Sequence, residues 1–308
     1  MTAEAGDGVM AASVQQSFDG MPKRLYSVSP SKLLAWLDCP LRYRMQYLDR
    51  PRPAARPQRA HTSIGVATHN ALRDFWDLPP VERTPAVVER LVRHLWIDTG
   101  FRDPVQSAQW RARTTTRVTA YLRGIDRDHQ PLGVERTVSL HTETLAVTGR
   151  LDRLDDREGE LVVVDYKTGR APLTDDDART SLPMALYAVA VAGMFRRPSE
   201  RVELHHVPTG TVLAHQHTPA TLARKVAEAE SIASDLRRAD AGYAESGVES
   251  PLFAPRVSPI CSWCDFRAHC PEGQQVGPEK SDWAGLEMDG PAGMEVRADR
   301  PGGESNGQ

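Results

Sequence analysis

The clearest pattern of hydrophobic and polar positions lies in the middle of the chain. Across residues 147–152, apolar or small residues alternate with polar ones, which is the two-residue period of a strand with one buried face. Residues 161–167 begin as a short apolar run of mostly β-branched residues, the composition of a second strand. Because the segment DDREGE between them is polar and turn-forming, the two strands are predicted to pair as a hairpin.

This hairpin is expected to gather charged side chains at one place. Side chains alternate between faces along a strand, so Asp165 and Lys167 are expected on one face and Tyr166 on the other. Antiparallel pairing would bring Asp152 close to Asp165. Neighbouring carboxylates repel each other unless they share a proton or bind a cation, and hard oxygen ligands favour Mg²⁺ or Mn²⁺. The alternative is that both acids are ordinary surface residues and that Lys167 pairs with one of them.

Helical periodicity surrounds the predicted strands. A helix is predicted to start at Ser29 and Pro30, which suit its cap and first position, and to kink or break at Pro40. A later helix carries His69. The remaining patterns predict helices from residue 63 or 65 to 76 and over 85–96, 107–125, 181–195 and 219–238, and short strands over 202–207 and 211–217. This succession predicts an α/β protein.

The two ends of the chain differ from its middle. Residues 1–22 are small and polar with little periodicity, and residues 276–308 are acidic and rich in Gly and Pro, so both are predicted to be disordered. Residues 23–275 are left as one domain. The longest apolar run, Met184 to Phe195, is too short to cross a bilayer, and no signal peptide is recognisable at the N-terminus. The protein is therefore expected in the cytoplasm.

Charge is distributed unevenly along the chain. The formal net charge is −3, but acids are concentrated at both ends, so the middle carries an excess of basic residues. One cluster of arginines includes Arg42 and Arg44. Such clusters neutralise nucleic-acid phosphates in many proteins, and they equally form solvated helix faces. The charge pattern therefore permits a nucleic-acid partner without requiring one.

The four cysteines form a second chemical pattern. Cys261, Cys264 and Cys270 lie within ten residues near the C-terminus, whereas Cys39 stands alone near the N-terminus. In a cytoplasmic protein this spacing favours a metal site over disulfides. Four thiolates hold either zinc or an iron–sulfur cluster, and the spacing alone leaves both possibilities open, together with a set of unrelated buried thiols.

The central hairpin resembles a known active site. The residues G-R-L-D, ending at Asp152, and the later residues V-V-D-Y-K-T-G, which contain Asp165 and Lys167, resemble the active-site hairpin of the PD-(D/E)XK nuclease superfamily. The similarity is to the branch that includes the RecB nuclease domain, AddB and the iron–sulfur CRISPR adaptation nucleases, and it covers about residues 25–271. It implies a restriction-endonuclease-like core: a central mixed sheet flanked by helices, with N-terminal helices and a C-terminal cysteine segment.

The resemblance also implies which residues form the site. His69, four residues after Gly65, matches the histidine that this branch contributes to the metal. Asp152 and Asp165 would be the carboxylate ligands, and the backbone carbonyl of Tyr166 would add another. Lys167 would orient the attacking water or stabilise charge on the phosphate. Glu135, one predicted strand earlier, is either a further ligand acting through water or a surface glutamate.

The helix after the hairpin departs from the family pattern. Related nucleases carry Q-x-x-x-Y there, and in this chain Tyr187 matches the tyrosine while Pro183 occupies the glutamine position. Tyr187 is assigned to the catalytic group and, with Arg42 and Arg44, to DNA binding. The missing amide puts that contact, and the level of activity, in question.

The cysteines also fit the resemblance. In the iron–sulfur members, one cysteine precedes the nuclease core and three follow it, and together they bind a [4Fe–4S] cluster. Cys39 matches the first, and Cys261, Cys264 and Cys270 match the others. The cluster would act as a clasp between the two ends of the domain, with zinc as the other occupant considered.

The function implied is a Mg²⁺- or Mn²⁺-dependent deoxyribonuclease. We expect an exonuclease acting on single-stranded DNA or DNA ends in repair or recombination, with a helicase or other repair proteins as partners. The alternative is a weak or inactive nucleic-acid-binding module beside a helicase. The chain has no G-x-x-x-x-G-K-[ST] loop and therefore no sign of a helicase motor of its own.

Overall fold

Six strands form one mixed sheet in the computed structural model, which describes residues 25–286. The predicted disordered segment 1–22 and residues 287–308 of the predicted disordered segment 276–308 lie outside the described residues. The strand order is β1-β3-β4-β5-β6, with β2 paired to β3, and only the β1–β3 and β4–β5 pairs are parallel. The strands are β1 Tyr26–Val28, β2 Gly133–His141, β3 Leu145–Arg157, β4 Glu160–Lys167, β5 Arg201–His206 and β6 Thr211–Gln216.

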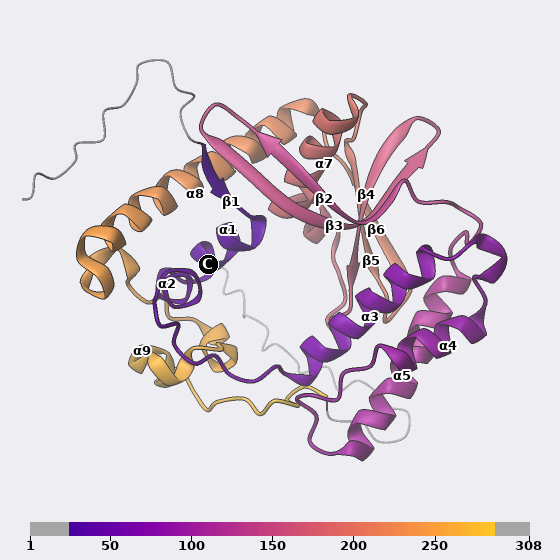
Figure 1. Ribbon diagram of the computed structural model, residues 1–308, viewed down its shortest axis with the longest axis horizontal. Coiled ribbons are helices and arrows are strands. Elements are labelled where there is room, and N and C mark those ends of the chain that lie inside the picture. Colours follow the sequence, from indigo (N-terminus) through magenta and orange to yellow (C-terminus); the bar gives the residue numbers. More distant parts are fainter. Residues whose placement is uncertain (1–24, 287–308) are drawn as a thin grey trace, which may run out of the picture.

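Helices cover both faces of this sheet, as the prediction of a central mixed sheet flanked by helices requires (Figure 1). Within residues 25–286 the α-helices are α1 Pro30–Asp38, α2 Pro40–Tyr47, α3 Ala60–Trp76, α4 Pro85–His94, α5 Pro104–Arg123, α6 Asp175–Thr180, α7 Leu182–Phe195, α8 Pro219–Ser246 and α9 Pro271–Gln274. None of them is both long and apolar enough to span a membrane.

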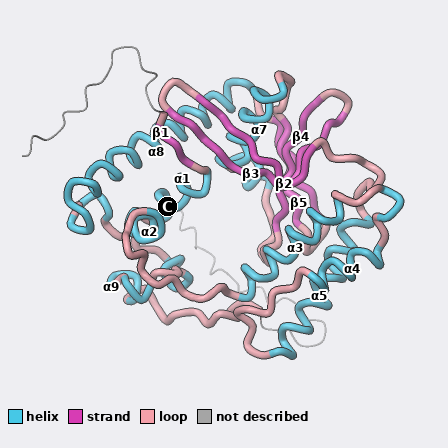
Figure 2. The backbone as a smooth tube through the Cα atoms, viewed as in Figure 1, coloured by secondary structure: helices cyan, strands magenta, loops and turns pink. Residues whose placement is uncertain are grey.

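The apolar run of β4 is buried on both sides, which explains why it reads as continuous rather than alternating. Val163 packs with the apolar face of α7, and Val162 and Val164 pack with α3, α4 and α5. A third core cluster joins β1 and the start of β3 to α1, α2 and α8. Figure 2 shows the resulting arrangement, with α1, α2 and α8 at one end of the sheet and α3 to α5 at the other.

The hairpin of β3 and β4 closes through a two-residue turn. Glu158 and Gly159 have φ angles of 53° and 97°, as a type I′ turn requires at both central positions. The pairing runs from Arg157 opposite Glu160 to Arg153 opposite Val164. The predicted hairpin is therefore present, and its register places Asp152 next to Asp165 at the point where regular pairing ends.

A buried polar network lies on the side of the hairpin that faces α3 and α5. Arg153 is 3% exposed, stacks 4.7 Å from the ring of Trp76 and donates to the Tyr166 hydroxyl. Its Nε lies 3.0 Å from the carboxylate of Asp155, which is 1% exposed. Asp155 also pairs with Arg157 at 2.9 Å. Such buried ions are tolerated because each has close partners of opposite charge.

The structure contains short elements that the sequence did not predict, and it orders part of the predicted tail. β1 and α6 were not predicted, because a three-residue strand and a six-residue helix are too short to leave a periodic pattern. Residues 276–286, predicted as the start of a disordered tail, are instead packed on the domain. Leu286 is 3% exposed and its carbonyl accepts from the Trp110 indole at 3.0 Å, so tertiary contacts override the Gly- and Pro-rich composition there.

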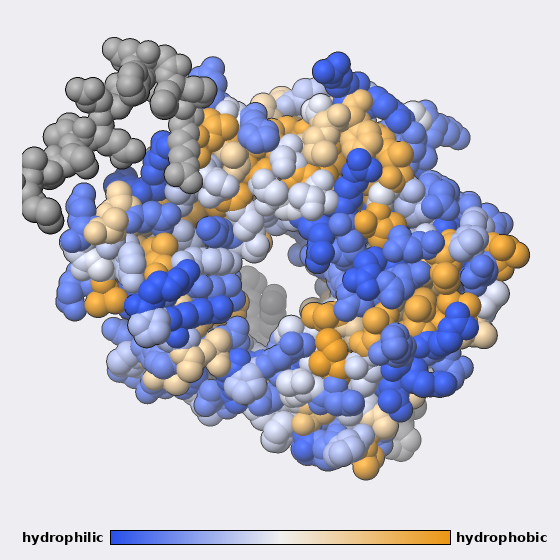
Figure 3. Space-filling view, viewed as in Figure 1, coloured by the Kyte–Doolittle hydropathy of each residue, from blue (hydrophilic) through white to orange (hydrophobic). Residues whose placement is uncertain are grey.

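An opening lies at the centre of the molecule, as Figure 3 shows. It is bordered by the sheet, α3, the segment between α2 and α3, and the helices α1 and α2 (Figure 1). The segment that carries the last three cysteines lies against the connection between α2 and α3, where the backbone N–H of Arg56 donates to the carbonyl of Asp265. The α2–α3 connection itself closes the ring, and the cysteine segment supports this connection from outside.

Removing Asp155 should be far more damaging than removing its neighbour Asp156. Asp155→Ala leaves the Arg153 guanidinium buried without its carboxylate, which should lower the free energy of unfolding by about 3–5 kcal/mol. Asp156 is exposed, where it pairs with Arg197 and accepts a hydrogen bond of 3.2 Å from the Gly159 N–H, so Asp156→Ala should lower the free energy of unfolding much less. Urea denaturation of the two variants measures the difference, and equal losses would contradict the structural role assigned to this network.

Candidate metal centre and active site

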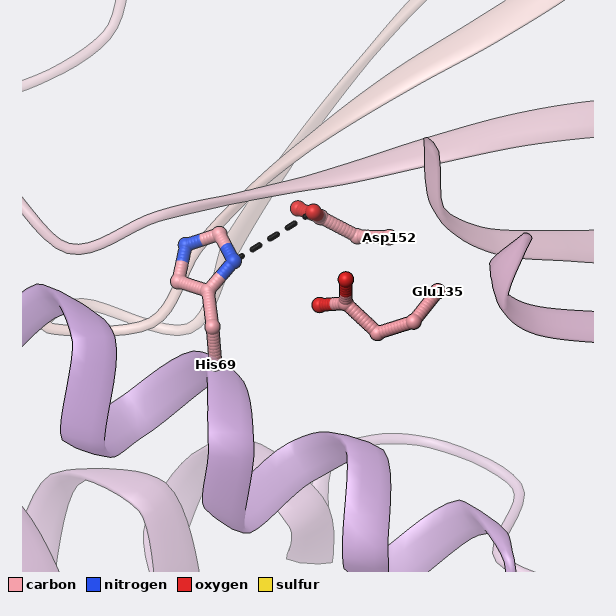
Figure 4. A group of neighbouring side chains, drawn as sticks. All are labelled: His69, Glu135 and Asp152. Carbon is pink, nitrogen blue, oxygen red and sulfur yellow. Dashed lines mark ion pairs between the residues drawn. The ribbon is translucent and has the colours of Figure 1, made fainter. Parts of the chain in front are cut away.

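Three potential metal ligands from three elements converge beside the hairpin. His69 of α3, Glu135 of β2 and Asp152 of β3 offer ligand atoms that all lie within 4.8 Å of one another (Figure 4). His69 Nδ1 is 3.3 Å from Asp152 Oδ1. One imidazole nitrogen and two carboxylates form a donor set that suits a divalent cation such as Mn²⁺.

A close approach of α3 to the end of β4 brings His69 to this place. A Cβ built on Gly65 would lie 3.3 Å from the Thr168 hydroxyl oxygen, so a larger side chain would press on the chain just after Lys167. Gly65 and His69 are one helical turn apart and therefore lie on the same side of α3. The Gly-x3-His spacing therefore lets α3 pack closely against the end of β4 and places His69 beside the hairpin.

Glu135 sits at an irregularity of the sheet. Val134 pairs with Arg153 and Arg136 with Leu151, so Glu135 lies opposite Asp152, yet these two residues do not pair. Glu135 has a φ of 47°, a left-handed conformation that residues other than glycine rarely adopt. Of the two possibilities left open by the sequence, this geometry favours a ligand over an ordinary surface glutamate.

Asp152 is held in place by the neighbouring strand. Its Oδ2 accepts a hydrogen bond of 2.7 Å from the backbone N–H of Tyr166, replacing the ladder bond that regular pairing would have made. The Tyr166 side chain points to the opposite side of β4, where its hydroxyl accepts from the Trp76 indole at 2.8 Å. The expected metal contact of the Tyr166 carbonyl remains a prediction.

Asp165 and Lys167 lie together, as expected from their alternation. Lys167 Nζ is 2.8 Å from Asp165 Oδ2. Burial raises the pKa of Asp165, Lys167 opposes this shift and Asp152 adds to it. Asp165 lies outside the group of three convergent ligands but adds a third carboxylate beside Glu135 and Asp152, and this local excess of carboxylates is what a bound cation would offset.

His69 responds to the same concentration of negative charge. Burial lowers its pKa, but the interaction with Asp152 and the charges of Asp165 and Glu135 outweigh burial, so the pKa of His69 is raised overall. Burial also raises the pKa of Glu135, with Arg150 opposing the shift from 2.8 Å. The raised pKa of His69 points to a site that stabilises positive charge.

Tyr187 is fixed against the β3 strand rather than extended into solvent. A Cβ built on Gly149 would lie 2.5 Å from Tyr187 Cε1, so the ring packs directly on the glycine backbone. Burial, and then the charges of Asp165 and Asp152, raise the pKa of Tyr187 to about 12. Pro183 occupies the first turn of α7, and the position of Tyr187 does not depend on a glutamine there.

The four cysteines surround one cavity of about 70 Å³. Each sulfur accepts a backbone N–H: Cys39 from Arg256 at 3.3 Å, Cys261 from Ser258 at 3.5 Å, Cys264 from Phe266, and Cys270 from Gly273 at 3.2 Å. The structure thus brings Cys39 together with the three distant cysteines. Within residues 25–286, no three of the sulfurs lie within 4.8 Å of one another.

The two arginines assigned to DNA binding have structural contacts. Arg42 lies 3.1 Å from Asp38 and lines the cysteine cavity. Arg44 lies 3.2 Å from Asp49 and donates to the carbonyl of Val248 at 2.8 Å, which ties α2 to the segment after α8. Their assignment to DNA binding remains a prediction.

Comparison with known proteins gives one family match. The family model described as the PD-(D/E)XK nuclease superfamily matches residues 27–271. No curated protein matches the sequence. A crystal structure of a protein from Eubacterium rectale named "putative exonuclease" is 12% identical, with a TM-score of 0.42 over 79% of this chain and 88% of its own. The structure of SSO0001 is 13% identical, with a TM-score of 0.33 over 82% and 89%.

The contact between Gly149 and Tyr187 should be sensitive to one methyl group. Gly149→Ala should lower the free energy of unfolding by about 1–3 kcal/mol, because the tyrosine ring must move. Tyr187→Leu in the same chain should relieve that strain, so the double variant should lose less than the sum of the single variants. Urea denaturation of the three variants measures this coupling. Additive losses would show that the ring does not press on residue 149.

Proposed function

The chain belongs to the PD-(D/E)XK nuclease superfamily, and we propose that it is a Mg²⁺- or Mn²⁺-dependent exonuclease that hydrolyses single-stranded DNA or DNA ends. The observation that carries this proposal is the convergence of His69, Glu135 and Asp152 beside the pair of Asp165 and Lys167. A nucleic-acid-binding module without activity would not need three convergent ligands next to a half-buried acid and a lysine.

The donor set fits a divalent cation. His69, Asp152 and Asp165 would hold the metal, with Glu135 as a further ligand directly or through water. A cation bound there supplies a Lewis acid for the phosphate and lowers the pKa of a coordinated water. Within the protein, the Tyr166 N–H fixes Asp152 and Lys167 fixes one oxygen of Asp165.

Lys167 has the position and the charge to act on the phosphate. Its side chain is paired with Asp165 but remains 43% exposed, so one side of it is open to a substrate phosphate. A compact cation there would orient the attacking water and stabilise the negative charge that develops on the phosphate oxygens. Tyr187, packed on Gly149, would keep the β3 strand in place next to these groups.

The central opening supports the choice of an exonuclease. The ligand group lies where α3 meets β2 and β3, elements that border this opening (Figure 1). A strand that enters a ring closed by the chain must be threaded from an end. We therefore propose that free single-stranded ends are the preferred substrate.

The cysteine cavity supports a [4Fe–4S] cluster in the manner of the RecB-like branch. Tetrahedral zinc with Zn–S bonds of about 2.3 Å would hold its sulfurs about 3.8 Å apart, whereas no three of these four sulfurs, all in the described part of the chain, lie within 4.8 Å. The wider spacing and the N–H groups directed at every sulfur fit a larger cofactor. The cluster would brace the ring by joining Cys39, which precedes α2, to the C-terminal segment that lies against the α2–α3 connection.

Asp165→Ala and Lys167→Ala should each reduce DNA cleavage at least about 100-fold, because each removes a group that acts on the reacting phosphate. Labelled single-stranded DNA with Mn²⁺ is the substrate, and Asp156→Ala on the outer part of the same hairpin is the matched control. Equal degradation by all four proteins would overturn the catalytic assignment.

Linear single-stranded DNA should be degraded at least ten times faster than a covalently closed circle of the same sequence. The circle offers no end to enter the central opening, and it is otherwise the same polymer. The two degradation rates are measured by gel electrophoresis under identical Mn²⁺ conditions. Equal rates would leave a nuclease but reject the exonuclease proposal.

Anaerobically purified protein should be brown and contain iron and sulfide. Cys261→Ala should lose the colour and lower the thermal unfolding temperature, because it opens the clasp between the two ends of the domain. Asp265→Asn, an exposed change between two of the cysteines, should keep both. A colourless wild-type protein with one zinc would reject the cluster.

A further inference from the structure

A second cavity, of about 370 Å³, adjoins the catalytic hairpin. Its apolar wall comes from four separate parts of the chain: Ile64 of α3, Trp110 of α5, Trp263 between two of the cysteines, and Leu286. Thr168 and Gly169 also line it. A volume above 300 Å³ with a mainly apolar wall is typical of a small-molecule or cofactor pocket.

The cavity lies close to the candidate metal centre. Thr168 and Gly169 directly follow Lys167 in the chain. Ile64 precedes His69 by five residues on α3, which corresponds to about 7.5 Å along the helix axis. Anything held in the cavity is therefore within reach of a strand whose phosphate lies at the metal centre.

The charged residues that line this cavity are arginines. Arg117 is half-buried above the Trp110 ring, with its guanidinium 5.5 Å from the ring centroid. Burial lowers the pKa of Arg117, and Arg113 and Arg170 lower it further. Arg170 lines the cavity as well and donates to the carbonyl of Gly285. The three cations keep the local potential positive.

A neighbouring cavity of about 530 Å³ shares His61 and Trp263 with the cavity of about 370 Å³ and is also lined by Arg59. Arg59, which precedes α3, is 3% exposed, and its guanidinium lies 5.3 Å from the centroid of the Trp263 ring. None of its three side-chain nitrogens has a hydrogen-bond partner in the described part of the chain. A buried cation without hydrogen bonds is costly, and an anionic ligand would offset that cost.

We propose that these two adjoining cavities form a nucleotide subsite, in which the Trp263 ring stacks with a base of the substrate strand and Arg117 pairs with a backbone phosphate. Flat aromatic surface beside arginines is the combination that binds single-stranded nucleic acid without reading its sequence. Metal binding at this place is disfavoured by the arginines. The subsite rests on the proposed function, because it would bind a DNA strand whose end lies at the metal centre.

The position of Trp263 links this subsite to the cysteine segment. Trp263 lies between Cys261 and Cys264, and the edge of its ring meets His61 of α3 at a centroid distance of 5.7 Å. The cysteine clasp therefore places one wall of the subsite against the helix that carries His69. In this arrangement the clasp orders substrate contacts as well as the fold.

Binding is measured on the Asp165→Ala protein with fluorescent oligo(dT), by anisotropy over a range of salt concentrations, so that cleavage does not interfere. Adding Trp263→Ala should weaken binding roughly 5- to 150-fold, and Trp263→Phe should restore most of it. Adding Arg117→Gln should reduce the slope of log K against log salt by about 0.7, the value for one phosphate contact on a single strand. The Trp263 variants should keep the parent slope.

Arg238→Gln on α8 is the matched control, because Arg238 is an exposed arginine that forms an ion pair with Asp235 at 2.9 Å, one turn away on the same helix. It should bind DNA as the parent does. The thermal unfolding temperature of Trp263→Ala, compared with that of the parent, shows whether the variant still folds. Since Arg117 lies on α5, its variant tests the subsite independently of that segment.

Two results separate this inference from the proposed function. If the wild-type protein degrades DNA but Trp263→Ala and Arg117→Gln bind as tightly and with the same slope as the parent, the subsite is wrong and the nuclease stands. If both variants lose binding as expected while the wild type shows no cleavage, the subsite stands and the exonuclease is wrong. Failure of the Asp165→Ala parent to bind oligo(dT) would overturn the subsite directly.

Discussion

The hydrogen bond from the Tyr166 backbone N–H to Asp152 links the buried core of the protein to the candidate metal centre. On one side of β4, the Tyr166 ring is locked by Trp76 and Arg153, within the core that also contains α3 and α5. On the other side, its backbone sets the place of the Asp152 carboxylate. The buried network thus acts as a rigid support, and a carboxylate held by a fixed N–H cannot turn away when a neighbouring negative charge repels it.

Much of this arrangement could be predicted from local sequence patterns. The strand alternation placed Asp165 and Lys167 together and Tyr166 on the other side, and helical spacing placed His69 on α3. The features that could not be predicted depend on contacts between distant residues. The left-handed φ of Glu135 and the packing of Tyr187 on Gly149 leave no periodic signal, because each is imposed by a neighbour far away in the chain.

The order of residues 276–286 has the same origin. Their composition suggests a flexible tail, but Glu279 and Asp282 pair with Arg56, and the carbonyl of Asp282 accepts from the N–H of Ala60 at the start of α3. The segment therefore caps a helix that needs acceptors at its first turn. Acidic residues that looked like solubilising charge have a defined structural partner.

Helix α3 spans the whole distance between the ligand group and the nucleotide subsite. It carries His69 near its middle and His61 near its start, and Arg59 precedes it. A continuous α-helix has a fixed rise of about 1.5 Å per residue, so the distance between the two sites stays constant whatever substrate is bound. A DNA strand held at both points must span this distance with a whole number of nucleotides. The geometry of α3 would therefore set the size of the fragments that the protein releases.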